Sequence, residues 1–310
     1  MDGSRHSVSH AMIVTKLNQI FYDVEAEQYD ERHPEVIEGD AGWWISRGEA
    51  LVGELRSGLQ AGAGLTILDL GCGTGFVSSL LSDYLVEGDL MVGLDQSEGM
   101  LKRARSKLLG KKLTPCRFTR GDAASLQFPD RSFHMLTLNS FLHHVYDYRK
   151  VLNEVDRVLK PGGYLLLAHE PNKAFFESPL IRMAASAWKA IGFGMTVPKD
   201  ISDTINSRLR EAHLTTSELR SDDILRLVEY HSPVEQGAIR IDNSKGFSLS
   251  DLLERELRDY TLIESTEYST FYHRPLLERH PCWMRVAKAA ASLLNGKGNL
   301  FSAVLRKEAV

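Results

Sequence analysis

Residues Ile67–Gly75 read ILDLGCGTG, an apolar run with one carboxylate followed by Gly71, Gly73 and Gly75 at alternate positions. The apolar run predicts a buried strand, and the glycines predict a sharp turn into a helix. Glycine also lets the backbone approach a ligand closely. In an open parallel sheet, ligands bind beyond the carboxyl ends of the strands, so this stretch predicts a binding turn.

The segments on either side of the turn predict an α/β fold. Short apolar runs alternate with helical stripes, which is the pattern of strand–helix units in a parallel sheet. Strands are predicted at residues 65–70, 90–95, 116–122, 132–140, 164–168, 260–271 and 299–307. A helix is predicted over 76–85, another near 283–294, and the KPGG of residues 160–163 is expected to end a helix.

The composition limits the classes of partner and compartment. The chain has 310 residues, 43% of them hydrophobic, and a formal net charge of −4 without a basic stripe, which disfavours a nucleic-acid substrate. Its three cysteines, Cys72, Cys116 and Cys282, are far apart and form neither a zinc motif nor a disulfide framework. The absence of a signal-like or bilayer-length apolar run predicts a cytoplasmic protein with no membrane partner.

The residue after the glycine turn separates two classes of ligand. A dinucleotide fingerprint, G-x-G-x-x-G, would require a third glycine at position 76, where this chain has Phe76. A nicotinamide-dependent oxidoreductase is therefore the weaker alternative, although it remains open.

Four stretches together carry a family resemblance. They are ILDLGCGTG, GLDQSEGML at 93–101, GDAASLQFPDRSFHMLTLNSFLHHV at 121–145, and VLKPGGYLLLAHEP at 158–171. In this order they resemble the class I S-adenosylmethionine-dependent methyltransferases of the small-molecule type, with a core like that of ubiquinone and menaquinone methyltransferases. The resemblance implies a Rossmann-like, mostly parallel seven-stranded sheet of order 3-2-1-4-5-7-6, with the last-formed strand antiparallel and helices on both faces.

The same resemblance implies that S-adenosylmethionine is the cofactor and assigns its contacts. The methionine end would lie at Asp69, Asn139 and the backbone of Gly71 and Gly73, in the cofactor-binding turn that Gly75 completes. The ribose would lie at Asp95, the adenine at Asp122 and Ala123, and Gln96 and Met100 near both. An N-terminal segment with Tyr22 and Tyr29 would fold across the cofactor, although two tyrosines seven residues apart equally fit one buried helical face. Each carboxylate could instead be a helix cap.

His143 and His144 follow the predicted fourth strand and are the candidate catalytic bases, because the pKa of imidazole lies near neutrality. The alternative is that one packs against a helix and the other bonds to backbone. His169 and Glu170 lie on the same predicted rim. His231, His273, His280, Glu229 and Glu278 lack ligand spacing, so no metal site is predicted.

Four parts of the chain are expected: an N-terminal helical cap (1–60), the cofactor-binding core (61–171), a helical insertion forming a substrate lid (172–245), and the remainder of the core sheet (246–310). Because residues 179–195 are rich in Met, Trp, Phe and Ile, the expected acceptor is a small, largely apolar metabolite, methylated on oxygen or carbon.

The function therefore predicted is methyl transfer to that metabolite, and three questions stay open. A protein that binds S-adenosylmethionine without turnover is a further alternative. A protein or nucleic-acid acceptor is disfavoured because NSFL, at 139–142, replaces the Asn-Pro-Pro-Tyr-like tetrapeptide of relatives that methylate amino groups. Whether the chain forms a homodimer is left open.

Overall fold

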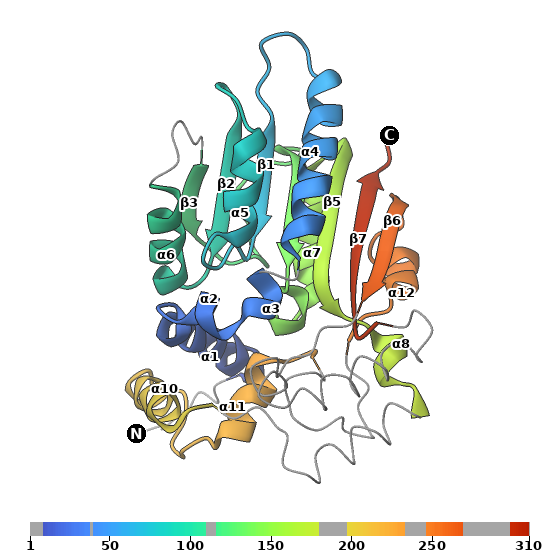
Figure 1. Cartoon of the computed structure of the whole chain (residues 1–310). Helices are drawn as coiled ribbons and strands as arrows, with labels where there is room; N and C mark the ends of the chain where they lie inside the picture. Colours follow the sequence, from blue (N-terminus) through green and yellow to red (C-terminus); the bar gives the residue numbers. More distant parts are fainter. Residues whose placement is uncertain are drawn as a thin grey trace, which may run out of the picture.

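The computed structural model describes residues 9–37, 40–109, 116–179, 197–232, 246–268 and 298–309. Its centre is a seven-stranded sheet of order β3-β2-β1-β4-β5-β7-β6 (Figure 1). The strands are β1 Thr66–Leu70, β2 Leu90–Asp95, β3 Cys116–Arg120, β4 Phe133–Asn139, β5 Leu159–Pro171, β6 Tyr260–Tyr268 and β7 Leu300–Lys307. Strand β7 is antiparallel to β5 and β6, whereas β3, β2, β1, β4 and β5 pair in parallel. The predicted strand order and fold class are confirmed.

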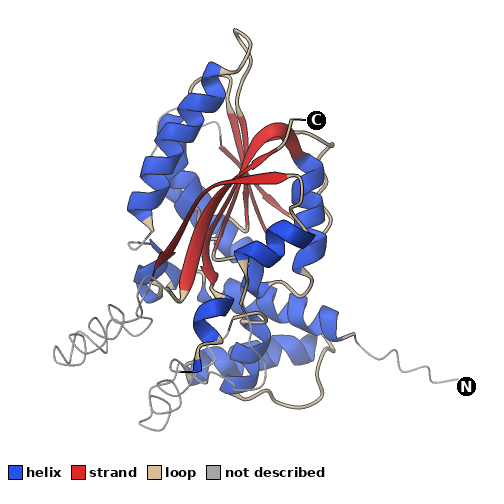
Figure 2. Ribbon diagram, turned by 90° about the vertical axis from the view of Figure 1, so that its right-hand side faces the viewer, coloured by secondary structure: helices blue, strands red, loops and turns tan. Residues whose placement is uncertain are grey.

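Helices cover both faces of the sheet, as the view in Figure 2 shows. Their bounds are α1 His10–Glu25, α2 Tyr29–Arg32, α3 Pro34–Ile37, α4 Ala41–Ser57, α5 Phe76–Leu81, α6 Glu98–Leu108, α7 Tyr148–Val158, α8 Lys173–Phe176, α10 Lys199–Glu211, α11 Ser221–Val228 and α12 Leu249–Arg255, with short 3-10 helices η1 Ser82–Tyr84 and η2 Leu142–His144. Among the residues placed here, none of the helices combines the length and the apolar composition needed to cross a bilayer.

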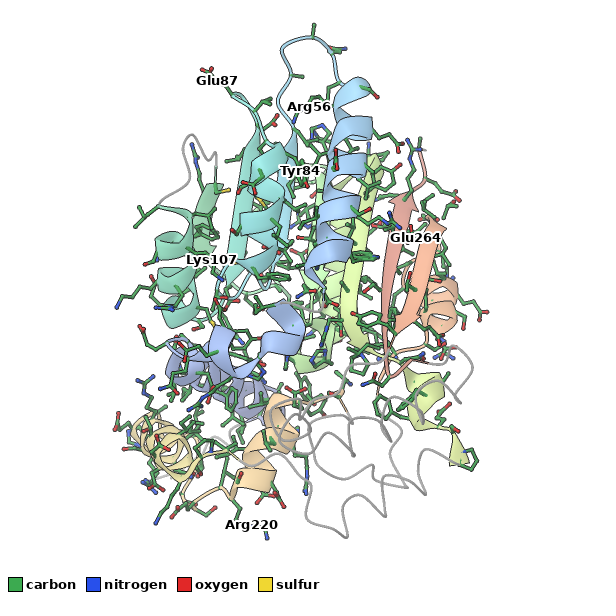
Figure 3. The ribbon with its side chains drawn as sticks, in the orientation of Figure 1. Arg56, Tyr84, Glu87, Lys107, Arg220 and Glu264 are labelled. Carbon is green, nitrogen blue, oxygen red and sulfur yellow. The ribbon has the colours of Figure 1, made fainter. Side chains whose placement is uncertain are left out.

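The two faces of the sheet form separate apolar layers because side chains alternate along each strand. Ile67 packs with Trp44 and Leu51 of α4, whereas Leu68 packs with residues of α7 such as Leu152. Arg56 holds the C-terminal end of α4 in place, because its guanidinium donates to the carboxylate of Asp89 and to the carbonyl of Tyr84. Arg56 and Tyr84 are labelled in Figure 3. Helix α4 is therefore a face helix of the sheet.

A third apolar layer lies at the carboxyl edge of the sheet, away from its faces. Leu17 and Phe21 of α1 pack with Ile205 of α10 and with Ile224 and Leu225 of α11. Figure 1 shows these three helices gathered beside the carboxyl ends of the strands. The N-terminal helix and the region after β5, far apart in sequence, thus form one cover over the edge where ligands bind in such sheets.

Three predicted boundaries differ from the structure or lie outside it. The helix predicted over 76–85 is α5 followed by η1. The helix predicted to end before KPGG is α7, which ends at Val158; the fifth strand begins earlier than predicted, at Leu159, and 160–163 form a bulge within β5, between the pairs Phe133–Leu159 and Met135–Tyr164. Residues 180–195, Cys282 and the helix predicted at 283–294 lie outside the described residues, as do His273, Glu278 and His280.

Candidate active site

The glycine turn after β1 adopts backbone angles that favour glycine. The φ angles of Gly71, Gly73 and Gly75 are +71°, +50° and +79°, in the left-handed region. A Cβ atom on Gly71 would lie 2.1 Å from the ring of Phe141, so crowding as well as φ excludes larger residues there. The turn is held against β2 because the N–H groups of Gly71 and Cys72 both donate to the Leu94 carbonyl.

Asp95, at the end of β2, holds its carboxylate in one orientation beside the turn. One oxygen accepts from the Gly73 N–H at 2.9 Å, and the other accepts from the Ser97 N–H at 2.8 Å. Burial raises the pKa of this carboxyl to about 6. Each carboxylate oxygen has two acceptor positions, so Asp95 can still accept a hydrogen bond at each oxygen.

A cavity of about 230 Å³, the first cavity, lies along these strand ends. Most of the predicted cofactor residues line it: Tyr29, Gly71, Gly73, Asp95, Gln96, Met100, Asp122, Ala123 and Asn139. Asn139 accepts from the indole N–H of Trp44 at 3.1 Å, which fixes its amide, and Asp122 accepts from the Ala124 N–H at 2.9 Å. Residues from β1, β2, β4 and the loop after β3 are thus brought to one surface.

The structure does not bring Asp69 and Gly75 to this surface. Asp69 is only 1% exposed, and its carboxylate accepts from the N–H and hydroxyl of Ser78 and from the hydroxyl of Thr137. Burial raises its pKa to about 6. The turn at Gly75 packs against Ala104 of α6. Both residues therefore support the glycine turn from the side away from the first cavity. The sequence motif alone could not distinguish this position from direct contact with a ligand.

Two carboxylates of the N-terminal segment fasten it over the first cavity. Asp23 accepts from the Ser97 hydroxyl at 2.6 Å and from the Gly99 N–H at 3.0 Å. Asp30 of α2 accepts from the Thr74 hydroxyl at 2.6 Å and pairs with Lys107, labelled in Figure 3, at 2.7 Å. The sequence analysis did not identify these ties, since each joins residues far apart in the chain.

A second cavity of about 240 Å³ adjoins the first. It lies between the N-terminal segment, the end of β4, η2, β5 and α11. Tyr22, Tyr29, Ser140 and His144 line both cavities and therefore mark the place where they meet. His143 lines only the second cavity. The two candidate histidines are thus neighbours with different surroundings.

His143 is oriented by Glu170, which lies behind it. Its Nδ1 lies 2.8 Å from a Glu170 oxygen, and the other Glu170 oxygen accepts from the N–H groups of Phe141 and Leu142. Burial raises the pKa of Glu170 to about 7 and lowers that of His143 well below its usual value. His143 is therefore a neutral imidazole whose Nε2 faces the cavity side.

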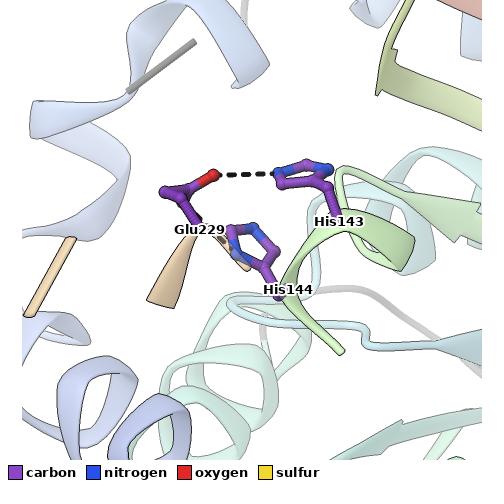
Figure 4. Close-up of side chains that lie close together, drawn as sticks. All are labelled: His143, His144 and Glu229. Atoms are coloured by element: carbon purple, nitrogen blue, oxygen red, sulfur yellow. Dashed lines mark ion pairs between the residues drawn. The ribbon is translucent and has the colours of Figure 1, made fainter. Parts of the chain in front are cut away.

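His144 contacts both the N-terminal cover and Glu229, which follows α11. The Tyr22 hydroxyl lies 3.0 Å from its Nε2, and a Glu229 oxygen lies 3.3 Å from its Nδ1. The second Glu229 oxygen lies 3.5 Å from Nε2 of His143 (Figure 4). Burial lowers the pKa of His144 well below its usual value. The spacing of residues in the sequence did not indicate that Glu229 lies beside these histidines, because only folding brings the end of α11 next to η2.

His169 lines the far wall of the second cavity, where its Nδ1 lies 2.7 Å from the Asp40 carboxylate. Its φ of +58° is unusual for a residue other than glycine. Of the two rim residues that the sequence suggested, His169 therefore lines the cavity, whereas Glu170 acts from behind His143.

Residues 68–167 match the family described as "Methyltransferase domain". The chain is 34% identical over 148 residues to a demethylmenaquinone methyltransferase of Lactococcus lactis, a match covering 48% of this chain and 56% of that protein. It is 41% identical over 102 residues to the enzyme of the same name from Listeria monocytogenes, covering 33% of this chain and 43% of that protein. The chain thus spans only about half the length of these curated relatives.

Solved structures align with more of the chain at lower identity. A structure described as an S-adenosylmethionine-dependent methyltransferase from Mesorhizobium loti aligns with 82% of this chain and 96% of its own, with a TM-score of 0.46 and 19% identity. One from Methanosarcina mazei, also described as a methyltransferase of this type, covers 83% and 98%, with a TM-score of 0.47 and 20% identity.

Proposed function

We propose that this chain, whose residues 68–167 match a methyltransferase domain, is a class I S-adenosylmethionine-dependent methyltransferase that transfers the cofactor's methyl group to a small, largely apolar metabolite. The observation that carries the proposal is the pair of adjoining cavities that share Tyr22, Tyr29, Ser140 and His144. A sulfonium methyl is already activated, so the protein has mainly to align an acceptor with it. Two ligands meeting at this junction would satisfy that requirement.

In this proposal the first cavity holds the cofactor. Asp95 accepts from the ribose hydroxyls while Gly73 and Ser97 hold its carboxylate still. The backbone at Gly71 and Gly73 and the amide of Asn139 face the methionine end, Gln96 and Met100 flank the ribose, and Asp122 and Ala123 face the adenine. Asp69 and Gly75 support the turn and do not touch the cofactor. Tyr29 closes the cavity from the N-terminal side.

The second cavity holds the acceptor. Its wall includes Phe21, Val36, Val197, Leu225 and Leu300, which favour an apolar body. His144 lies where the two cavities meet, so the oxygen or acidic carbon that receives the methyl group would point there. The relatives' name, demethylmenaquinone methyltransferase, supports a quinone-like acceptor; a polyketide or another lipid-derived molecule remains part of the proposal.

His144, with His143 beside it, is the group proposed to favour loss of the acceptor's proton. His144 lies at the junction and is neutral near pH 7, because burial lowers its pKa.

The proposal also keeps the remaining predictions from the sequence. The chain divides into the four parts given above, acts in the cytoplasm and has no nucleic-acid or membrane partner. Whether it forms a homodimer is left open.

Calorimetric titration with S-adenosylmethionine, with S-adenosylhomocysteine and with NADH tests the cofactor. Micromolar affinity for the first two alone is expected, and binding of NADH alone would overturn the proposal in favour of an oxidoreductase. Incubation with labelled S-adenosylmethionine and a panel of quinols, phenols and polyketides then tests transfer. Tight cofactor binding without turnover on any acceptor would instead support a binding protein.

A further inference from the structure

Three side chains on the wall of the second cavity converge on one point. His143, His144 and Glu229 each offer one ligand atom, and these atoms all lie within 4.8 Å of one another (Figure 4). His143 and His144 belong to η2, whereas Glu229 follows α11. The sequence predicted no metal site because Glu229 has no ligand-like spacing to either histidine. Folding supplies the proximity that the sequence lacks.

The distances from the two imidazoles to the two Glu229 oxygens are longer than charge-assisted hydrogen bonds and compatible with metal ligands. Nε2 of His143 lies 3.5 Å from one Glu229 oxygen, and Nδ1 of His144 lies 3.3 Å from the other. A charge-assisted N–H···O bond is shorter, about 2.7–2.9 Å. Ligand atoms held about 2.1 Å from one ion at tetrahedral angles lie about 3.4 Å apart.

We propose that His143, His144 and Glu229 bind a divalent transition-metal ion, with Nε2 of His143, Nδ1 of His144 and the Glu229 carboxylate as ligands. Two nitrogens and one carboxylate with further positions open are typical of catalytic zinc and of non-haem iron sites. Mg²⁺ prefers oxygen ligands and fits this set poorly.

The groups behind the imidazoles fit this role. Metal-bound histidines usually donate their other N–H to a carboxylate or another polar group, which fixes the ring. Glu170 lies 2.8 Å from Nδ1 of His143, and the Tyr22 hydroxyl lies 3.0 Å from Nε2 of His144. Nε2 of His143 is therefore left toward Glu229, whereas Nδ1 of His144 also lies 3.1 Å from the Tyr22 hydroxyl. Nδ1 of His144 would exchange its contact with the Val228 carbonyl, at 3.2 Å, for the ion.

The charge and the burial of Glu229 fit as well. Glu229, only 2% exposed, would bring the negative charge that a divalent ion needs.

The use of this ion in catalysis rests on the proposed function, whereas its binding does not. An acceptor hydroxyl bound at an open position would lose its proton to water, because the metal stabilises the resulting anion. The oxygen lone pair then forms the new C–O bond while the C–S bond breaks, leaving S-adenosylhomocysteine. In this form the ion replaces a free imidazole as the group that promotes proton loss.

The test is calorimetric titration of the chelator-treated full chain with Zn²⁺, and with Mg²⁺ as the hard-ion control. We expect the chain to bind a single Zn²⁺, and Glu229→Gln, which keeps the side-chain size, to weaken that binding by more than about 10-fold, the lower bound for loss of a supporting residue. Glu25→Gln is the matched control: Glu25 is a buried carboxylate of the same cavity, paired with Arg32. It should retain the affinity for Zn²⁺.

Absence of Zn²⁺ binding, or equal affinity in Glu229→Gln, would overturn the proposal. If Glu229→Gln does not fold by circular dichroism, the visible spectrum of the Co²⁺-loaded wild-type chain decides: absorption typical of bound nitrogen ligands, diminished in His143→Gln, supports the site, and a spectrum of aqueous Co²⁺ overturns it. Titration of the same samples with S-adenosylmethionine tests the proposed function separately, since the first cavity does not include Glu229.

Discussion

The two cavities are built in different ways. The first is lined mainly by residues at the ends of strands β1, β2, β3 and β4, with α1 and α7 contributing further residues, and its fixed carboxylate, Asp95, accepts hydrogen bonds from nearby backbone. The second is assembled from segments distant in the chain, and its ionisable side chains face one another. The first therefore depends on backbone shape and the second on side-chain chemistry, so substitutions should affect cofactor binding and turnover separately.

The largest difference between the effect on turnover and the effect on cofactor binding is expected for His144→Asn. Loss of the imidazole at the junction should lower turnover by about 10²–10⁴-fold, whether it acts as a base or as a metal ligand, and change the dissociation constant of S-adenosylmethionine far less, because His144 is one of many residues lining the first cavity. His213→Asn is the control, because His213 is an exposed histidine whose φ of +55° asparagine tolerates. Parallel loss of cofactor binding in His144→Asn would show that the cavities are not independent.

Gly71→Ala should damage the first cavity through the backbone. The left-handed conformation costs about 1–2 kcal/mol for alanine, and the contact with Phe141 adds about 1–3 kcal/mol to the loss of unfolding free energy. Gly73→Ala is the matched variant, since its Cβ would meet nothing within 4 Å and only the cost of φ applies. Denaturant titration measures both, and equal losses would contradict the crowding at Gly71.

Asp95→Ala should weaken S-adenosylmethionine binding by about 1–3 kcal/mol, because an ionised hydrogen-bond acceptor is lost. Calorimetry measures the change, and Asp83→Ala, at the exposed Asp83 of η1, provides the control. An unaltered affinity in Asp95→Ala would refute the ribose contact.

Cofactor affinity should depend on pH through Asp95. The pKa of Asp95 in the ligand-free protein is raised to about 6, and the ionised carboxylate is the form that accepts hydrogen bonds. The affinity for S-adenosylmethionine should therefore be highest above pH 6 and should fall as the pH drops below 6. At pH 5 the dissociation constant should be about tenfold larger. The dependence should disappear in Asp95→Asn. If it persists there, Asp69, whose pKa is also about 6, is the titrating group.

The smallest effect is expected for Asp30→Asn. This change weakens the tie from α2 to Thr74 and Lys107, and the partly exposed ion pair contributes no more than about 1 kcal/mol. Cofactor affinity should fall less than about fivefold. Glu98→Gln, which breaks the exposed pair with Arg105, should leave it unchanged. A larger loss of affinity in Asp30→Asn would mean that the tie from α2 contributes more to cofactor binding than a partly exposed ion pair does.

The sequence predicted what depends on neighbours in the chain. The glycine turn follows from the residues themselves, whereas the strand order and the grouping of Asp95, Asp122 and Asn139 were implied by the family resemblance, whose motifs lie at strand ends that parallel strands bring to one edge. It did not predict that Asp69 turns away toward Ser78, since the same motif permits either orientation. Nor did it find Glu229, whose position depends on how α11 packs with α1.

The packing of α1 with α10 and α11 has a consequence for how such a protein changes its substrate. Helix α11, which lines the second cavity, and α10 beside it are the helices on which α1, part of the cover of the first cavity, rests. The molecule is therefore not modular: exchanging residues 197–228 for another sequence, to admit a new acceptor, would also move α1 and with it Tyr22 and Asp23. Changes of specificity, natural or engineered, should therefore be accompanied by compensating substitutions in the first thirty or so residues.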